Sequence, residues 1–135
     1  MRRWDLKLEQ FSISKYRYRE LHNFCRQYPE WRDELKYNTD ALRGGSMDGM
    51  PRGGKKSDST GNIAIRRAEL QRKCEIIEQT AIEADAEIYQ YLITNVTQDV
   101  GYYYLRDIMR MPAGKKKFYK ARRNFFSLLD IKKDA

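Results

Sequence analysis

The sequence predicts an all-α protein, built as a helical hairpin and a long helix followed by a C-terminal helix-turn-helix. Three observations support this prediction. Apolar residues recur at i, i+3/4 and i+7 through most of the chain. Residues 63–100 contain neither proline nor glycine, whereas six of the eight glycines fall within residues 43–62. Helical spacing with the breakers gathered in one segment indicates helices separated by a single long loop.

The N-terminal helical segment is predicted to contain two helices. Residues 14–27 have an apolar face at helical spacing, and Ser14 is a suitable N-cap for this first helix. Pro29 suits the first turn of a second, short helix, in which Trp31 and Leu35 lie four residues apart and share the buried side. The two helices are expected to form a hairpin or a kinked pair.

Residues 43–62 are predicted to be a Gly-rich loop or linker, because they contain no aromatic residue that could anchor them by burial. The segment lacks the GxxxxGK[ST] spacing of a phosphate-binding loop. Residues 63–99 then form a long helical spine, which exceeds the usual helix length of about 8–20 residues. It is either divided near Ala84 or continuous as a coiled-coil-like element that can form a homo-oligomer.

The C-terminal segment is predicted to be a helix-turn-helix, since MPAG supplies a short turn between two apolar stripes. The second helix should begin between residues 113 and 115. The domain organisation is therefore residues 1–42, 43–62, 63–99 and 100–135. The first stripe consists of Tyr104, Leu105, Ile108 and Met109, and the second of Phe118, Ala121, Phe125, Leu128 and Leu129.

The basic residues are concentrated at the C-terminal end. The whole chain has 27 Lys and Arg against 19 Asp and Glu, a net charge of +8. Residues 100–135 have ten basic and three acidic residues, whereas residues 63–99 have four and seven. A basic module joined to a nearly neutral body indicates an element that binds polyanions, and nucleic acid is the commonest of these. The alternative is a solvated, Lys-rich terminal helix.

A helix that enters the DNA major groove reads base edges from its first turn and contacts phosphates along its sides. The candidate residues for binding double-stranded DNA lie on the exposed side of the second predicted helix or at its margin. We expect Arg122 to act as a phosphate clamp. An RNA-binding helix, a helix for an acidic protein partner and a membrane-surface helix are competing interpretations. The candidates are Lys115, Lys116, Lys117, Tyr119, Lys120, Arg122 and Arg123.

Other features favour neither catalysis nor a membrane. No run approaches the ~20 apolar residues of a membrane span, and the N-terminus lacks the apolar core of a secretory signal.

Two cysteines and one histidine argue against a disulfide framework and a zinc site, and His22 and Cys25 are better explained as structural. The run of Glu83, Asp85 and Glu87 is expected to be solvated. A cytoplasmic protein that is not an enzyme and uses no metal or cofactor is expected. Of Tyr102, Tyr103 and Tyr104, one or two can contact nucleic acid, although a half-buried tyrosine with a hydrated hydroxyl is the commoner arrangement at the start of a helix.

Three sequence segments, in order, carry a resemblance to a known family. They read QYPEWRDEL, SDSTGNIAIRRAEL and RMPAGKKKFYKARRNFFSLL. Together they resemble the ArpU/RinA-type regulators of phages that infect Gram-positive bacteria. The resemblance implies a phage-encoded activator of late genes, with a C-terminal helix-turn-helix similar to region 4 of sigma factors, acting on DNA with host RNA polymerase. It places DNA contacts on the candidate residues named above.

Two other functions fit the same features. The first is a phage DNA-packaging protein similar to a small terminase subunit, which also combines a helix-turn-helix with helical oligomerisation. The second is an inhibitor or adaptor whose basic helix covers a host protein or ribonucleoprotein.

Overall fold

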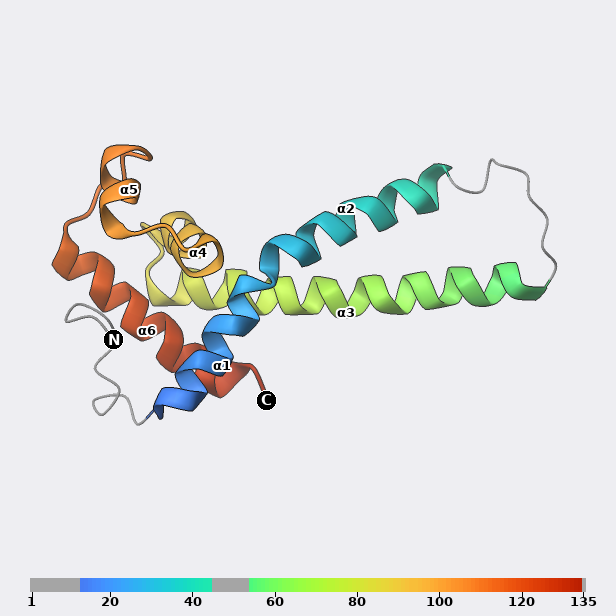
Figure 1. The fold of residues 1–135 in the computed structure, drawn as a ribbon, viewed down its shortest axis with the longest axis horizontal. Coiled ribbons are helices and arrows are strands. Elements are labelled where there is room, and N and C mark those ends of the chain that lie inside the picture. The colour runs from blue at the N-terminus through green and yellow to red at the C-terminus, as the bar shows by residue number, and fades with distance from the viewer. Residues whose placement is uncertain (1–12, 45–53, 135) are drawn as a thin grey trace. The chain divides into compact units, whose positions relative to one another are not determined.

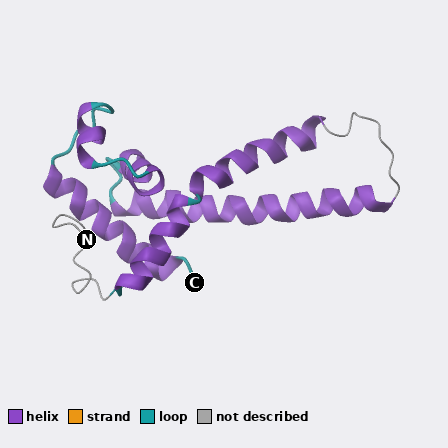
Figure 2. Cartoon of the chain, in the orientation of Figure 1, coloured by secondary structure: helices purple, strands orange, loops and turns teal. Residues whose placement is uncertain are grey.

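A computed structural model describes residues 13–44 and 54–134. Within these ranges the chain consists of helices joined by turns and short loops and contains no strand (Figure 2), which confirms the predicted all-α class. The helices are α1 (Lys15–Arg26), α2 (Tyr28–Gly44), α3 (Gly54–Ala84), α4 (Tyr89–Gln98), α5 (Tyr102–Asp107) and α6 (Lys115–Lys132). None of the helices in these ranges is long and apolar enough to cross a membrane.

The chain divides into two compact units. The first contains Met1–Gln27 and Ile76–Ala135, and the second contains Tyr28–Glu75. Helix α3 contributes residues to both units, because the division falls within it.

The second unit is an antiparallel hairpin of α2 and the first part of α3 (Figure 1). Arg66 donates from Nε and Nη2 to the two carboxylate oxygens of Glu34, at 2.8 and 3.2 Å. The Nζ of Lys73 lies 5.2 Å from the centre of the Trp31 ring. Trp31 and Leu35 are both buried, as their four-residue spacing predicts.

The predicted loop over residues 43–62 is wrong at both of its ends. Helix α2 continues to Gly44, and α3 already begins at Gly54, so residues 54–62 are helical. The remaining residues of the predicted loop, 45–53, lie outside the described ranges. Glycine destabilises a helix by about 1 kcal/mol relative to alanine. This cost is small enough that a helix can extend through glycine where a long helical segment follows directly.

In the first unit, α1 packs against α4 and α6. The helix begins as predicted, because Ser14 Oγ accepts a hydrogen bond from the Arg17 backbone N–H at 3.0 Å. Leu21 and Cys25 on α1 are buried, and so is Phe126 on α6. These residues contribute to the core of the first unit.

The predicted helical spine is divided near Ala84, which was one of the two alternatives. Helix α3 ends at that residue, and α4 begins at Tyr89. Between them, Asp85 Oδ1 accepts hydrogen bonds from the backbone N–H groups of Glu87, at 2.9 Å, and Ile88, at 3.3 Å. An aspartate that bonds to nearby backbone in this way competes with helix formation, which explains the break.

Helices α5 and α6 follow the predicted order, but residues 108–114 connect them, a longer segment than the expected three-to-four-residue turn. The predicted apolar stripe that begins on α5 is wrong at two of its four positions, although Leu105 is buried as predicted. Tyr104 is 47% exposed and Ile108 is 65% exposed, whereas Tyr102 is buried together with Leu105. The Tyr102 hydroxyl donates to the Ala113 carbonyl oxygen at 3.3 Å. Because α5 has only six residues, its sequence spacing does not fix which side faces inward.

The apolar side of α6 agrees with its prediction. Phe118, Ala121, Phe125 and Leu129 are buried, and Leu128 is partly buried. Burial at this spacing fixes the rotation of α6 and therefore determines which of its basic residues face solvent.

Candidate nucleic-acid interface

The candidate interface begins at the N-terminal end of α6. Gly114 is the N-cap residue, with an extended backbone and no side chain that could cap the helix. The N–H groups of the first turn have no intrahelical acceptors, and they lie at the positive end of the helix dipole. This end of α6 therefore favours a negatively charged ligand.

Three of the predicted basic residues are available to such a ligand. Lys116 and Lys120 are exposed and Arg123 is partly exposed. None of the three forms an ion pair with an acidic residue of the described ranges. Lys116 and Lys120 also line an open groove of about 680 Å³ beside the first turns of α6. Their charges are therefore not neutralised within that part of the chain.

Lys115 lies against an exposed aromatic residue of α5. Its Nζ is 4.7 Å from the centre of the Tyr103 ring, and the Cζ of Arg106 is 4.9 Å from the same ring. Both distances are within the range of a cation–π interaction. Tyr103 is 53% exposed, so the ring organises two cations from two different elements at the surface.

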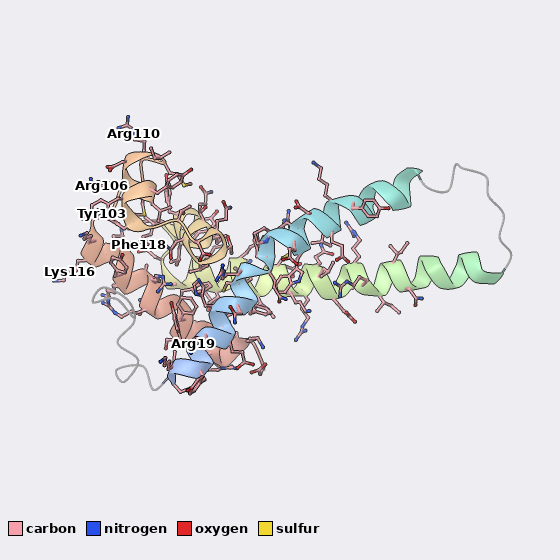
Figure 3. All side chains as sticks on the ribbon, viewed as in Figure 1. Arg19, Tyr103, Arg106, Arg110, Lys116 and Phe118 are labelled. Atoms are coloured by element: carbon pink, nitrogen blue, oxygen red, sulfur yellow. The ribbon has the colours of Figure 1, made fainter. Side chains whose placement is uncertain are left out.

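Two basic residues near α5 extend this surface, and the sequence interpretation missed them. Arg106 and Arg110 are exposed, and Figure 3 shows them with Tyr103 and Lys116 at the same end of the first unit. Arg106 also pairs with Asp107 at 2.7 Å, which holds the pKa of that carboxyl below its usual range. Arg110 has a positive φ of 61° at the point where the chain turns toward α6. A signal for both arginines was present, since they lie four residues apart in the basic C-terminal segment.

Lys117 differs from its neighbours because it is paired. Its Nζ lies 2.8 Å from Glu87 Oε1, in the turn between α3 and α4. This hydrogen bond raises the pKa of Lys117 above its usual value. The predicted ligand contact of Lys117 would therefore have to compete with a carboxylate that already holds the ammonium group.

Arg122 does not lie on the surface with the other candidates. Only 7% of the residue is exposed, and its guanidinium lies over the Phe126 ring, 5.0 Å from the centre. It donates to Asn95 Oδ1 and to the Tyr18 hydroxyl, each at 2.9 Å. The expected role of a phosphate clamp on the outer side of α6 does not fit this position. The partners that bury Arg122 are distant in the sequence, so local spacing could not predict them.

Tyr119 is partly buried at the margin of α6. Its ring packs against Phe118, with ring centres 4.9 Å apart, and lies 6.5 Å from that of Tyr102. These contacts place it between the apolar side and the basic side, as its sequence position predicts.

The other candidate chemistries find no support in the described ranges. No group of three or more His, Cys, Asp or Glu residues there is arranged to hold a metal ion. Burial raises the pKa of the Cys25 thiol, so it remains protonated at neutral pH and is a poor nucleophile.

Comparison with known proteins does not identify a family, because no protein-family model, curated protein or solved structure matches the chain. Function must therefore be argued from the residues themselves.

Proposed function

We propose that the protein binds double-stranded DNA through the start of α6 and the adjoining part of α5. Phosphate contacts come from Lys115, Lys116, Lys120 and Arg123, with Arg106 and Arg110 extending the contact surface. In keeping with the family resemblance, the DNA is promoter DNA, and the protein regulates late phage genes together with host RNA polymerase. The two helices act as a helix-turn-helix whose second helix is α6.

One observation supports this proposal more than any other. The first turn of α6 consists of lysines and contains no acidic residue, although cations are unfavourable at the positive end of a helix dipole. A helix selected for stability alone would have acidic side chains in its first turn. Residues that oppose local stability are expected where a ligand compensates for them, and a phosphate backbone is such a ligand.

The test compares two sets of lysine and arginine substitutions at opposite ends of α6. The combined variant Lys116→Ala, Lys120→Ala, Arg123→Ala removes cations that have no acidic partner in the described ranges. The control variant Lys132→Ala, Lys133→Ala removes two cations that pair with Glu83 and Asp134. Fluorescence anisotropy with a labelled duplex measures the affinity of each.

We expect the triple variant to bind at least about tenfold more weakly than the wild type, and the control to change by less than about twofold. Equal losses in both variants would mean that binding depends on net charge alone. Unchanged binding by the triple variant would refute the proposal.

The packaging alternative predicts a different assembly. A ring of many subunits, measured by light scattering of the full chain, would favour a packaging role over transcription regulation. For a regulator we expect a small oligomer, and footprinting upstream of the neighbouring genes should show protection that depends on polymerase.

A further inference from the structure

A polar pocket of about 390 Å³ lies within the first unit, beside α6. Side chains from α1, from α4 with its C-cap, and from α6 line it. Arg122 and Lys120 are two positions apart, which separates them by about 200° around the helix. The main polar lining residues are Tyr18, His22, Asn95, Asp99, Tyr119 and Arg122.

The cation in this pocket has an incomplete set of partners. Arg122 is more than nine-tenths buried and donates from Nε to Asn95 and from Nη2 to Tyr18. Its Nη1 is buried and has no hydrogen-bond acceptor among the residues that the structure describes. Both groups that it does contact are neutral. A buried guanidinium is normally paired with a carboxylate or another anion, so this arrangement lacks a counter-ion.

Tyr18 adds a second donor beside it. Its hydroxyl oxygen accepts from Arg122 Nη2 at 2.9 Å, so its own proton must point elsewhere. Within the described ranges that proton has no acceptor. Two adjacent groups from different helices therefore offer donors without acceptors, and the ligand that completes them is an oxygen-rich anion.

Neither of the other neighbours supplies the missing charge. The Phe126 ring lies 5.0 Å from the guanidinium carbon and stabilises the cation, but it offers no oxygen lone pair. Asp99 lines the same pocket, yet its carboxylate pairs with Arg26 at 2.7 Å and lies 3.7 Å from His22 Nε2. The charge of Asp99 is thus matched by α1 rather than by Arg122.

We infer that this pocket binds a phosphate group, held by the guanidinium of Arg122 and the Tyr18 hydroxyl. Donors on two separate helices suit a tetrahedral anion better than a planar carboxylate, which pairs with one guanidinium edge. The volume falls in the range of small-molecule sites, so the phosphate can belong to a larger molecule. This site goes beyond the proposed DNA contacts and does not depend on them.

The test is a titration of the full chain with inorganic phosphate at constant ionic strength, with acetate as the comparison anion. Calorimetry gives the affinity, and the Nε–Hε resonance of Arg122 reports the site. Phosphate should shift this resonance in a saturable way, and acetate should not. Tyr18→Phe keeps the ring packing against Phe126 and removes only the hydroxyl, so we expect about tenfold weaker binding and an unchanged far-UV spectrum.

A second variant separates this site from the DNA interface. The pair Lys116→Ala, Lys120→Ala should bind phosphate like the wild type, even where it loses affinity for duplex DNA. No saturable shift at Arg122, equal effects of acetate, or loss of phosphate binding in the lysine pair but not in Tyr18→Phe would each overturn the inference.

The source of the phosphate is distinguished by competition. Displacement of inorganic phosphate by a 5′-phosphorylated duplex, but not by the same duplex without that group, would support the site and identify a nucleic-acid end. Displacement by a mononucleotide but by neither duplex would support it as a site for a small phosphate ester.

Discussion

The two ends of α6 differ in how their basic residues are neutralised. At the C-terminal end, Arg17 of α1 donates to Asp130 at 2.6 Å and pairs with Asp134 at 2.9 Å, while Lys132 pairs with Glu83. At the N-terminal end, exposed lysines such as Lys116 have no acidic partner in the described ranges. Net charge alone therefore does not identify a binding surface. Three of the cations in the proposed interface, Lys116, Lys120 and Arg123, have no acidic partner in the described ranges.

The difference follows from where the acidic residues lie. Residues 115–129 of α6 contain no Asp or Glu, whereas Asp130 and Asp134 follow directly. Acids at the end of a helix oppose its dipole, but here arginine and lysine side chains hold them. The C-terminal end thereby ties α6 to α1, whereas Lys116 and Lys120 at the N-terminal end have no acidic partner in the described ranges.

A substitution on the buried apolar side of α6 should give the largest effect. Phe125→Ala removes a fully buried ring from α6, and we expect a loss of about 3–5 kcal/mol in the free energy of unfolding. Urea denaturation of the full chain measures this loss. Leu128→Ala, at a partly buried position, is the matched control and should cost clearly less. Similar costs at both positions would contradict the observed rotation of α6.

The next largest effect is expected at the C-terminal end of α6, where charged side chains are paired. Arg17→Gln breaks the part-buried bond to Asp130, and we expect a loss of about 1 kcal/mol in stability. The Arg17 hydrogen bond also holds the pKa of Asp134 below its usual value. The folded state therefore gains stability above the unfolded pKa of Asp134, about 4, and loses it as the pH falls. Arg17→Gln should weaken this acid dependence, measured by urea midpoints between pH 3 and pH 6. An unchanged pH profile would contradict the pairing.

The sequence predicted where the helices lie along the chain better than it predicted the tertiary contacts between them. The burial of Phe118 and Phe125 followed from spacing, because α6 is long enough for its periodicity to fix one inward side. Short α5 has no such constraint, and Tyr102 rather than Tyr104 is buried. Likewise, the position of Arg122 depends on Tyr18, 104 residues away in the sequence. Such a contact has no local sequence signature.

A smaller effect should follow when a paired lysine near the interface is released. Glu87→Gln removes the carboxylate that holds Lys117, and we expect duplex binding to strengthen by about two- to fivefold. Glu83→Gln releases Lys132 at the other end of α6 and is the matched control. Fluorescence anisotropy at fixed salt should show a change in the first variant only. Equal gains would mean that only net charge matters.

The smallest effect should come from the aromatic residue that organises Lys115 and Arg106. Tyr103→Ala removes an exposed cation–π contact, and we expect duplex binding to weaken by about twofold. Tyr103→Phe keeps the ring and should bind like the wild type, as measured by the same anisotropy assay. A loss in the phenylalanine variant would instead assign the role to the hydroxyl group.

The most direct test of the account is the salt dependence of duplex binding. Plots of log affinity against log salt concentration for the wild type and for Lys116→Ala, Lys120→Ala, Arg123→Ala report how many phosphates each protein neutralises. Removal of three phosphate contacts should make the slope shallower by about 2 to 3. The Lys132→Ala, Lys133→Ala control should retain the wild-type slope. Equal slopes for the wild type and the triple variant would show that the start of α6 does not contact the phosphate backbone.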